Sequence, residues 1–199
     1  FALCDNVDDL AKTIGAVNTL VVRDGAVHGY NTDYLGFLGN LDDKAPGWAD
    51  GSGDAIVIGA GGAARAILVA LRKRWKGKVH ILNRTLANAE ALVAEIDDSF
   101  EAHGFEDFAA LAPQTGLVVN TSSIGLHSTR FDWLDLELLR KSALVTDIVY
   151  SPLITPLLED AEKAGLKTVD GLGMLLHQAV PGFADWFGVR PTVTPELRA

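Results

Sequence analysis

The feature that most constrains the fold is a glycine-rich loop between a buried strand and a helix. The loop follows the apolar run AIVI at 55–58 and consists of Gly59, Ala60, Gly61, Gly62, Ala63 and Ala64. It fits the pattern G-x-G-x-x-A, in which the first glycine permits a tight turn, the second admits a pyrophosphate and the last small residue lets helix and strand pack closely. We therefore predict that residues 59–63 bind dinucleotide phosphates at the positive end of a helix. The alternative is a purely structural turn.

From residue 54 onward, short apolar runs alternate with helical segments. We predict strands at 55–58, 78–82, 117–120, 143–149 and 167–169, and helical segments at 63–74, 86–96, 134–139, 156–164 and 174–186. The apolar runs are continuous rather than alternating, which is typical of parallel strands covered on both faces. The pattern predicts an α/β fold with a Rossmann-type, doubly wound parallel sheet.

The first fifty residues have a different pattern. Residues 1–12 suit a helix, and residues 19–30 suit a β-hairpin with Asp24 and Gly25 at its turn. Residues 42–53, with a proline and three glycines, suit a connection.

Composition excludes several classes of protein and partner. The chain has 199 residues, 48% of them apolar, a net charge of −9 and a pI near 4.9. This acidic balance argues against nucleic acid and anionic membranes as partners, and no apolar run approaches a membrane span or a signal peptide. The single cysteine, Cys4, fits a reducing cytoplasm and is expected to be a small buried residue. The five histidines show no metal-binding spacing, so we expect no metal.

The end of the second predicted strand indicates which dinucleotide binds. NAD-binding folds usually place an acidic residue there, about 20 residues after the glycines, to bind the ribose hydroxyls. This chain instead has Asn83, Arg84 and Thr85, three hydrogen-bond donors suited to a phosphate. We predict NADP as cofactor, with Arg84 as the main contact to the 2′-phosphate; the alternative is a solvated surface arginine.

The motifs GAVNTL, YNTD, GAGGAA, NRT and DGLGMLLHQA occur in this order, and with them the chain resembles the shikimate dehydrogenase family. The resemblance implies NADPH-dependent reduction of 3-dehydroshikimate to shikimate, in the chorismate pathway to aromatic amino acids. It also implies three parts: residues 1–33 as the remnant of an α/β substrate-binding domain, residues 34–172 as the NADP domain, and residues 173–199 as a helix returning to the substrate domain.

The resemblance assigns residues on both sides of a cleft. Asp33 is one half of a catalytic Lys–Asp pair, and the residues on the substrate side are Asn18, Asp33, Tyr150 and Gln178. On the cofactor side it adds Thr121, Ser122, Ile148 and Gly171. Several of these follow predicted strands, where ligands bind in open α/β sheets.

Each assignment has a plainer alternative. Asp33 could be a turn or N-cap residue, Asn18 a turn residue, Gln178 part of a polar helix face and Tyr150 a half-buried aromatic residue. We interpret Met174 and residues 172–176 as core.

The chain departs from the family pattern in two places. No segment before or around Lys12 matches the family's serine-containing carboxylate site or its catalytic lysine, so we expect the 199-residue chain alone to be a poor catalyst. Asn88 stands where the family often has a second basic residue, which should weaken the preference for NADP over NAD.

Three other functions stay open at this stage. They are a quinate/shikimate dehydrogenase that uses NAD, a non-catalytic NADP-binding module, and another NADP enzyme with a similar Rossmann domain, such as glutamyl-tRNA reductase. The predicted partner is a small molecule, and the protein is expected to be a monomer or homodimer.

Overall fold

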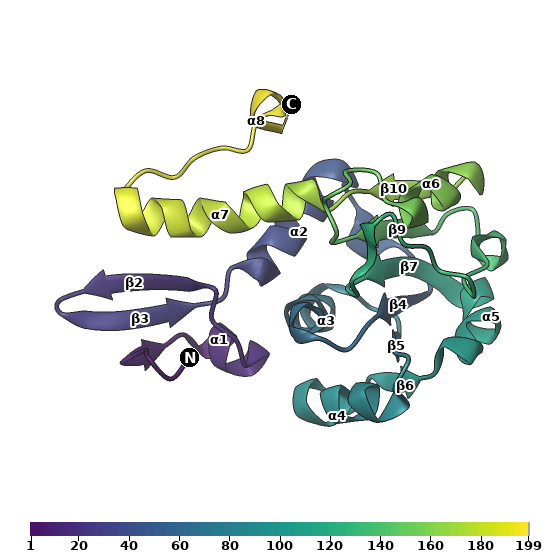
Figure 1. Cartoon of the computed structure of the whole chain (residues 1–199), viewed down its shortest axis with the longest axis horizontal. Coiled ribbons are helices and arrows are strands. Elements are labelled where there is room, and N and C mark those ends of the chain that lie inside the picture. The colour runs from purple at the N-terminus through teal and green to yellow at the C-terminus, as the bar shows by residue number, and fades with distance from the viewer. Residues whose placement is uncertain (199) are drawn as a thin grey trace.

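Two β-sheets of different size organise the computed structural model, which describes residues 1–198 (Figure 1). The strands of the larger sheet are β4 (Asp54–Ile58), β5 (Val79–Leu82), β6 (Glu101–His103), β7 (Thr115–Asn120), β9 (Leu144–Asp147) and β10 (Lys167–Val169). The strands of the smaller sheet are β1 (Asn6–Val7), β2 (Thr19–Arg23) and β3 (Ala26–Tyr30). A further short strand, β8 (Ile124–His127), follows β7.

The larger sheet is parallel throughout, with the order β10-β9-β7-β4-β5-β6. The chain runs outward from β4 to β6, returns to β7 on the other side of β4, and then runs outward to β10. The strand order therefore reverses between β4 and β7, which confirms the predicted doubly wound sheet and gives it a topological switch point.

Helices cover both faces of this sheet, as the continuous apolar strands predict. Alternate residues of β4 separate into two cores, with Ala55 and Val57 on one face and Ile56 and Ile58 on the other. The first face packs against α2 (Asp33–Lys44), α3 (Gly62–Arg74) and α4 (Leu86–Ile96), and the second against α5 (Phe108–Leu111) and α6 (Pro156–Lys163).

The predicted helix at residues 1–12 is wrong in its first part. Residues 6–7 form β1, which pairs with β3, and α1 (Asp9–Ile14) begins only at Asp9. The reason is local, because the Asp8 side chain accepts hydrogen bonds from the backbone N–H groups of Leu10 and Ala11 and so caps the helix there. The hairpin is confirmed, and Asp24 and Gly25 both have positive φ, at 51° and 79°.

Two long helices connect the sheets. Helix α2 follows the hairpin, and α7 (Leu172–Phe187) lies along α2 and continues to β2 (Figure 1). At its far end the Trp186 indole N–H donates to the Leu20 carbonyl over 2.9 Å. Helix α2, strand β6 and strand β8 are not among the predicted elements, and the predicted connection begins inside α2. The remaining elements are η1 (Trp48–Asp50), η2 (Phe105–Asp107), η3 (Ala112–Gln114), η4 (Leu136–Leu138) and α8 (Pro195–Arg198).

Among residues 1–198, none of the helices has both the length and the apolar character needed to cross a membrane.

Candidate active site

The glycine loop lies at the switch point, where its backbone is tightly held on one side and open on the other. Gly59 has φ = 106°, and a Cβ there would lie 3.0 Å from the Thr121 hydroxyl and 3.1 Å from the Ser122 nitrogen. Gly61 and Gly62 differ, because a Cβ on either would meet no atom within 4 Å. Packing within the protein therefore explains the glycine at 59 but not those at 61 and 62, whose bare backbone faces open space.

Helix α3 begins directly at this open backbone. Its N-cap is Gly61, and no side chain among residues 1–198 caps the helix. The first N–H groups of a helix have no partner within the helix, and their aligned dipoles favour an anion. The loop therefore has the features of a phosphate-binding site at a helix N-terminus.

The end of β7 holds the loop in place. The Thr121 hydroxyl donates to the Ile58 carbonyl over 2.8 Å, and the Thr121 backbone N–H donates to the same oxygen over 2.9 Å. The Ser122 hydroxyl donates to the Asn120 side-chain oxygen over 2.7 Å. Both predicted cofactor residues thus lie beside the loop, with their hydroxyls engaged in local hydrogen bonds.

The segment 83–85 lies between the end of β5 and the start of α4. The Asn83 side chain donates to the Thr85 carbonyl over 2.9 Å, which fixes the turn. Arg84 and Thr85 are exposed, and no ion pair of Arg84 is found within residues 1–198. The guanidinium is therefore available to a ligand from solvent.

A cavity of about 390 Å³ collects most of the remaining predicted residues. Its lining comes from the residue before β2, from α2, α3 and α7, and from the loops that follow β9 and β10. The lining residues are Asn18, Asp33, Ala63, Ile148, Tyr150, Gly171, Met174, Leu175 and Gln178. Substrate-side and cofactor-side predictions thus meet in one cavity.

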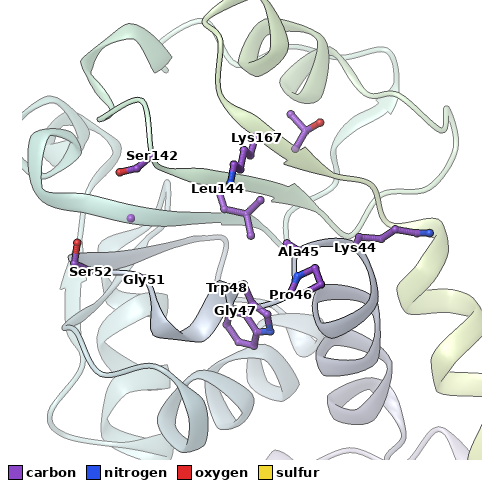
Figure 2. Close-up of a pocket in the computed structure, with 12 residues that line it drawn as sticks. Lys44, Ala45, Pro46, Gly47, Trp48, Gly51, Ser52, Ser142, Leu144 and Lys167 are labelled. Carbon is purple, nitrogen blue, oxygen red and sulfur yellow. The ribbon is translucent and has the colours of Figure 1, made fainter.

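A larger cavity, of about 660 Å³, lies at the opposite end of the sheet (Figure 2). It is lined by the segment that joins α2 to β4 and by the first residues of two strands, Leu144 of β9 and Lys167 of β10. None of the predicted site residues lines it. Its position at the amino ends of the strands is not where open α/β sheets bind their ligands.

Hydrogen bonds connect the polar residues of the smaller cavity. Asn18 donates through its amide to the Asp33 carboxylate over 2.9 Å, and its side-chain oxygen accepts from the Thr32 hydroxyl over 3.1 Å. That hydroxyl also lies 3.0 Å from the side-chain oxygen of Gln178. Thr32 is buried and directly precedes α2, and it therefore connects Asn18 to Gln178 of α7. Thr32 is not among the site residues predicted from the sequence, although it lies inside the YNTD motif.

Gln178 reaches this network because α7 approaches α2 very closely. A Cβ on Gly36 would lie 2.6 Å from both the Gln178 Cβ and the Met174 carbonyl oxygen, and one on Gly39 would lie 2.8 Å from the His177 ring. Only glycine permits this approach without a shift of one helix. Gln178 thus faces the network rather than solvent. Met174 is buried as predicted, whereas Leu175 is partly exposed and lines the cavity instead of the core.

Asp33 is the first residue of α2, so the alternative of an N-cap does not apply; Thr32 holds that position. Burial raises the pKa of the Asp33 carboxyl above its ordinary value, and the hydrogen bond from Asn18 opposes this rise. A carboxyl whose pKa moves towards neutrality exchanges protons more readily near physiological pH, which is the property that a general acid or base requires.

The strand order, the bare glycine loop and the adjoining cavity define an α/β protein of the dinucleotide-binding Rossmann type. The sequence model of the family described as shikimate / quinate 5-dehydrogenase matches residues 49–175. The chain belongs to this family, as the motifs in the sequence indicate.

Curated relatives share half of their aligned residues with the chain. A protein of Mesorhizobium japonicum, named shikimate dehydrogenase (NADP(+)), is 53% identical over 199 residues, which are 100% of this chain and 71% of that protein. A protein of Brucella ovis with the same name is 52% identical over 201 residues, which are 100% of this chain and 69% of that protein.

Solved structures of shikimate and quinate dehydrogenases have the same fold as this chain. Shikimate 5-dehydrogenase from Thermus thermophilus, in complex with NADP(H) and shikimate, superposes with a TM-score of 0.83 at 37% identity, over 96% of this chain and 69% of that one. Quinate dehydrogenase from Corynebacterium glutamicum, in complex with NAD, has a TM-score of 0.85 at 30% identity, over 96% and 70%.

Proposed function

We propose that this protein is an NADP-dependent shikimate dehydrogenase, which interconverts 3-dehydroshikimate and shikimate. The observation that carries the proposal is the shared cavity, in which Asn18, Asp33 and Gln178 face the glycine loop and the ends of the strands. The NADP(+) in the relatives' names and the bound ligands of the Thermus protein support the same substrate and cofactor.

The proposal assigns the cofactor to the carboxyl end of the sheet. The phosphates would bind at residues 59–63, where the backbone is open, and the 2′-phosphate would bind the exposed Arg84 between Asn83 and Thr85. Thr121, Ser122, Ile148 and Gly171 would border the nicotinamide side. When bound, the nicotinamide supplies or accepts the hydride.

The polar residues of the cavity would then position the substrate and its proton. Asn18 and Gln178 carry amides that can bind hydroxyl groups, and Tyr150 lies at the cavity with half of its surface exposed. Asp33 would hold or transfer the proton of the reacting oxygen, to which its raised pKa is suited. Thr32 would act as a positioning residue, because it contacts both Asn18 and Gln178.

The division of the chain into residues 1–33, 34–172 and 173–199 stays part of this proposal. It is supported by the separate small sheet and by the return of α7 to β2. A cytoplasmic location is supported by the free thiol of Cys4. The oligomeric state, monomer or homodimer, is to be measured by light scattering.

Binding and turnover are tested separately, because the chain spans about 70% of the length of its curated relatives. Titration of the 199-residue chain with NADPH, followed by nucleotide fluorescence at low salt, should give saturable binding that is at least tenfold tighter than NADH binding. Absence of NADPH binding would overturn the proposal.

Turnover is measured with shikimate and NADP⁺ beside quinate and NAD⁺. Faster turnover of quinate with NAD⁺ would identify the protein as a quinate dehydrogenase, the other activity that the family's description names. Tight NADPH binding without turnover in any length of the polypeptide would indicate a binding module.

A further inference from the structure

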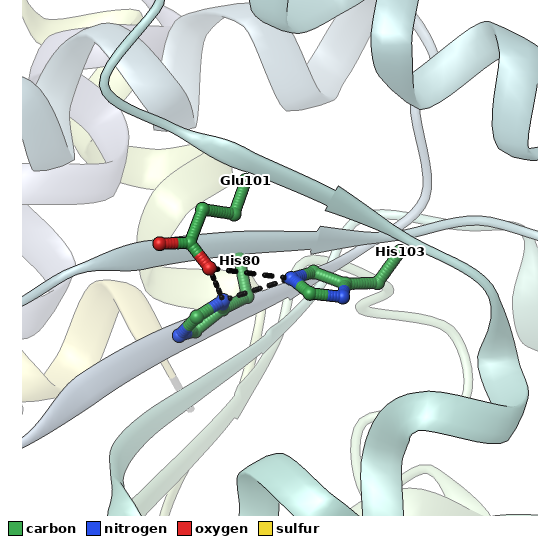
Figure 3. Close-up of side chains that lie close together, drawn as sticks. All are labelled: His80, Glu101 and His103. Carbon is green, nitrogen blue, oxygen red and sulfur yellow. Dashed lines mark hydrogen bonds and ion pairs between the residues drawn. The ribbon is translucent and has the colours of Figure 1, made fainter.

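A second group of polar side chains lies away from the nucleotide cavity, on β5 and on the edge strand β6 of the larger sheet. His80 of β5 stands opposite Glu101 of β6, and His103 follows two residues later on the same face of β6. Figure 3 shows the two imidazoles and the carboxylate pointing towards one another. His80 and His103 are 23 residues apart in the sequence, and only the pairing of β5 with β6 brings them together.

Three potential metal-binding atoms converge in this cluster. His80 Nδ1 lies 3.1 Å from His103 Nε2 and 3.4 Å from a carboxylate oxygen of Glu101, which is 3.7 Å from His103 Nε2. Metal–ligand bonds of about 2.0–2.2 Å in a tetrahedral site place the ligand atoms roughly 3.3–3.6 Å apart. The observed separations span this range, so an ion fits between the three atoms with small adjustments.

The other nitrogen of each imidazole faces a carboxylate. His80 Nε2 lies 3.4 Å from Asp54 Oδ2, and His103 Nδ1 lies 3.3 Å from Asp107 Oδ2. When His80 Nε2 and His103 Nδ1 each carry the ring proton and hydrogen-bond to these carboxylates, the other ring nitrogens are unprotonated. His80 Nδ1 and His103 Nε2 then present lone pairs to one another and to Glu101. Facing lone pairs repel unless a cation lies between them. Carboxylates behind metal-binding histidines orient the rings in this way in many metalloproteins.

The rest of the surroundings favours a divalent cation. Lys78 binds the other oxygen of Glu101 over 2.8 Å and leaves Oε2 free to face the histidines. Asp54, Glu101 and Asp107 together outweigh the positive charge of Lys78. The His80 side chain is only 3% exposed, which protects the site from water on one side. On the other side an open cavity of about 280 Å³, lined by Lys78, His80 and Glu101 among others, has room for a fourth ligand such as water.

We propose that His80, Glu101 and His103 form a binding site for a divalent transition-metal ion of the zinc type, which joins the edge strand β6 to β5. Two imidazole nitrogens and one carboxylate oxygen suit Zn²⁺, Co²⁺ or Ni²⁺, whereas Mg²⁺ and Ca²⁺ prefer oxygen ligands. The sequence predicts no metal site, because the spacing of the histidines along the chain does not show that β5 and β6 bring two of them together. The site is independent of the proposed dehydrogenase function.

The test uses Zn²⁺ and Co²⁺ as probes on the purified 199-residue chain after treatment with a chelator. Calorimetric titration should show one Zn²⁺ per chain, and Co²⁺ should give the intense visible absorption of a four-coordinate ion. Zn²⁺ should also raise the unfolding temperature, because it binds only the folded pairing of β5 with β6.

The informative variants lie on the half-buried edge strand β6 and in η2, which follows it, and they keep side chains of similar size so that folding is preserved; circular dichroism checks this. His103→Gln and Glu101→Gln should each weaken Zn²⁺ binding at least tenfold and remove the rise in unfolding temperature. Asp107→Asn, which alters only a carboxylate behind the ligands, should weaken binding roughly tenfold. His28→Gln is the matched control, since His28 lies on β3 in the smaller sheet, outside the cluster, and should leave affinity within twofold.

Two results would overturn the proposal. One is the absence of Zn²⁺ binding by the wild type, which would leave the cluster as hydrogen-bonded histidines that share a proton. The other is equal Zn²⁺ affinity of the wild type and His103→Gln, which would assign the binding to residues outside the cluster.

Discussion

The two ends of the six-stranded sheet differ in how their polar groups are arranged. The cavity at the carboxyl end is the smaller one, about 390 Å³ against about 660 Å³. Yet it joins Asn18, Asp33 and Gln178, which lie far apart in the sequence, through hydrogen bonds to one another or to Thr32. The larger cavity has loops and strand starts around it and none of the predicted site residues. Convergence of polar groups, rather than volume, therefore distinguishes the candidate active site.

The carboxyl groups at the two ends of the sheet also differ in the direction in which their pKa is shifted. At the carboxyl end, burial raises the pKa of Asp33, and it raises the pKa of Asp147 to about 6, although hydrogen bonds from Thr155, Val149 and Asn120 oppose it. At the amino end, the hydrogen bond from Lys78 lowers the pKa of Glu101. Carboxylates that burial destabilises thus lie at the carboxyl end, beside the candidate site, where function can account for their cost. Glu101, whose carboxylate is stabilised by Lys78, lies at the amino end, away from the site.

The largest expected effect comes from replacing Asp33. Asp33→Asn should lower kcat roughly 10²–10⁴-fold, because it removes a positioned proton-transfer group while preserving shape. NADPH affinity should stay within about twofold. Steady-state kinetics, in a length of the polypeptide that turns over, and fluorescence titration measure the two quantities. A parallel loss of both would assign Asp33 a structural role instead.

The second effect concerns stability and pH at Asp147. Its pKa is raised in the folded state, so the folded protein binds this proton more strongly than the unfolded chain. The contribution to stability is complete below the ordinary pKa of 3.8 and is lost as pH rises through about 6. The change corresponds to about 3 kcal/mol. Relative to Asp147→Asn, the wild type should therefore lose free energy of unfolding between about pH 4 and about pH 7, as measured by urea denaturation.

Glu101→Gln, studied with chelator present, provides the matched control from the amino end. Because the pKa of Glu101 is lowered in the folded state, its contribution has the opposite sign: it is present above the ordinary pKa of 4.5 and is lost as pH falls. The free energy of unfolding of the wild type, relative to each variant, should therefore change with pH in opposite directions for Asp147→Asn and Glu101→Gln. The same direction in both comparisons would contradict the difference between the two ends of the sheet.

The third effect concerns the choice of cofactor. Arg84→Ala should weaken NADPH binding about 10–50-fold, the range expected for a lost charge-assisted hydrogen bond, and leave NADH binding nearly unchanged. Arg74→Ala, which removes an arginine that pairs with Asp42 instead, is the control. The ratio of the two dissociation constants, from fluorescence titration, is the measured quantity. A uniform loss for both nucleotides would exclude recognition of the 2′-phosphate by Arg84.

The smallest effect is expected at the amino-end cavity. Lys44→Ala and Lys167→Ala alter two residues of its lining and should change NADPH affinity and kcat by less than about twofold, since ligands of open α/β sheets bind at the carboxyl end. The same titrations and assays apply. A tenfold loss in either variant would overturn the assignment of the site to the carboxyl end.

Local patterns predicted five of the six strands of the larger sheet and missed its edge strand β6. They did not predict the contacts between segments that lie far apart in the sequence. Residues 55–58 and 86–96 were predicted within one residue, because continuous apolar runs and helical periodicity report burial directly. Helix α2 was missed because Gly36 and Gly39 weaken its pattern, and their role depends on α7, more than a hundred residues later. The link through Thr32 and the meeting of His80 with His103 likewise depend on pairing that no local pattern encodes.

The close contact of α7 with α2 has a mechanical consequence. Near its middle α7 carries Gln178 against Gly36, and at its far end the Trp186 indole is hydrogen-bonded to Leu20 of the hairpin. Because a helix is stiff, we expect a tilt of the hairpin to move α7, and with it Gln178, relative to Ala63, which lines the same cavity. We therefore expect the orientation of the small sheet and the width of the cavity to change together.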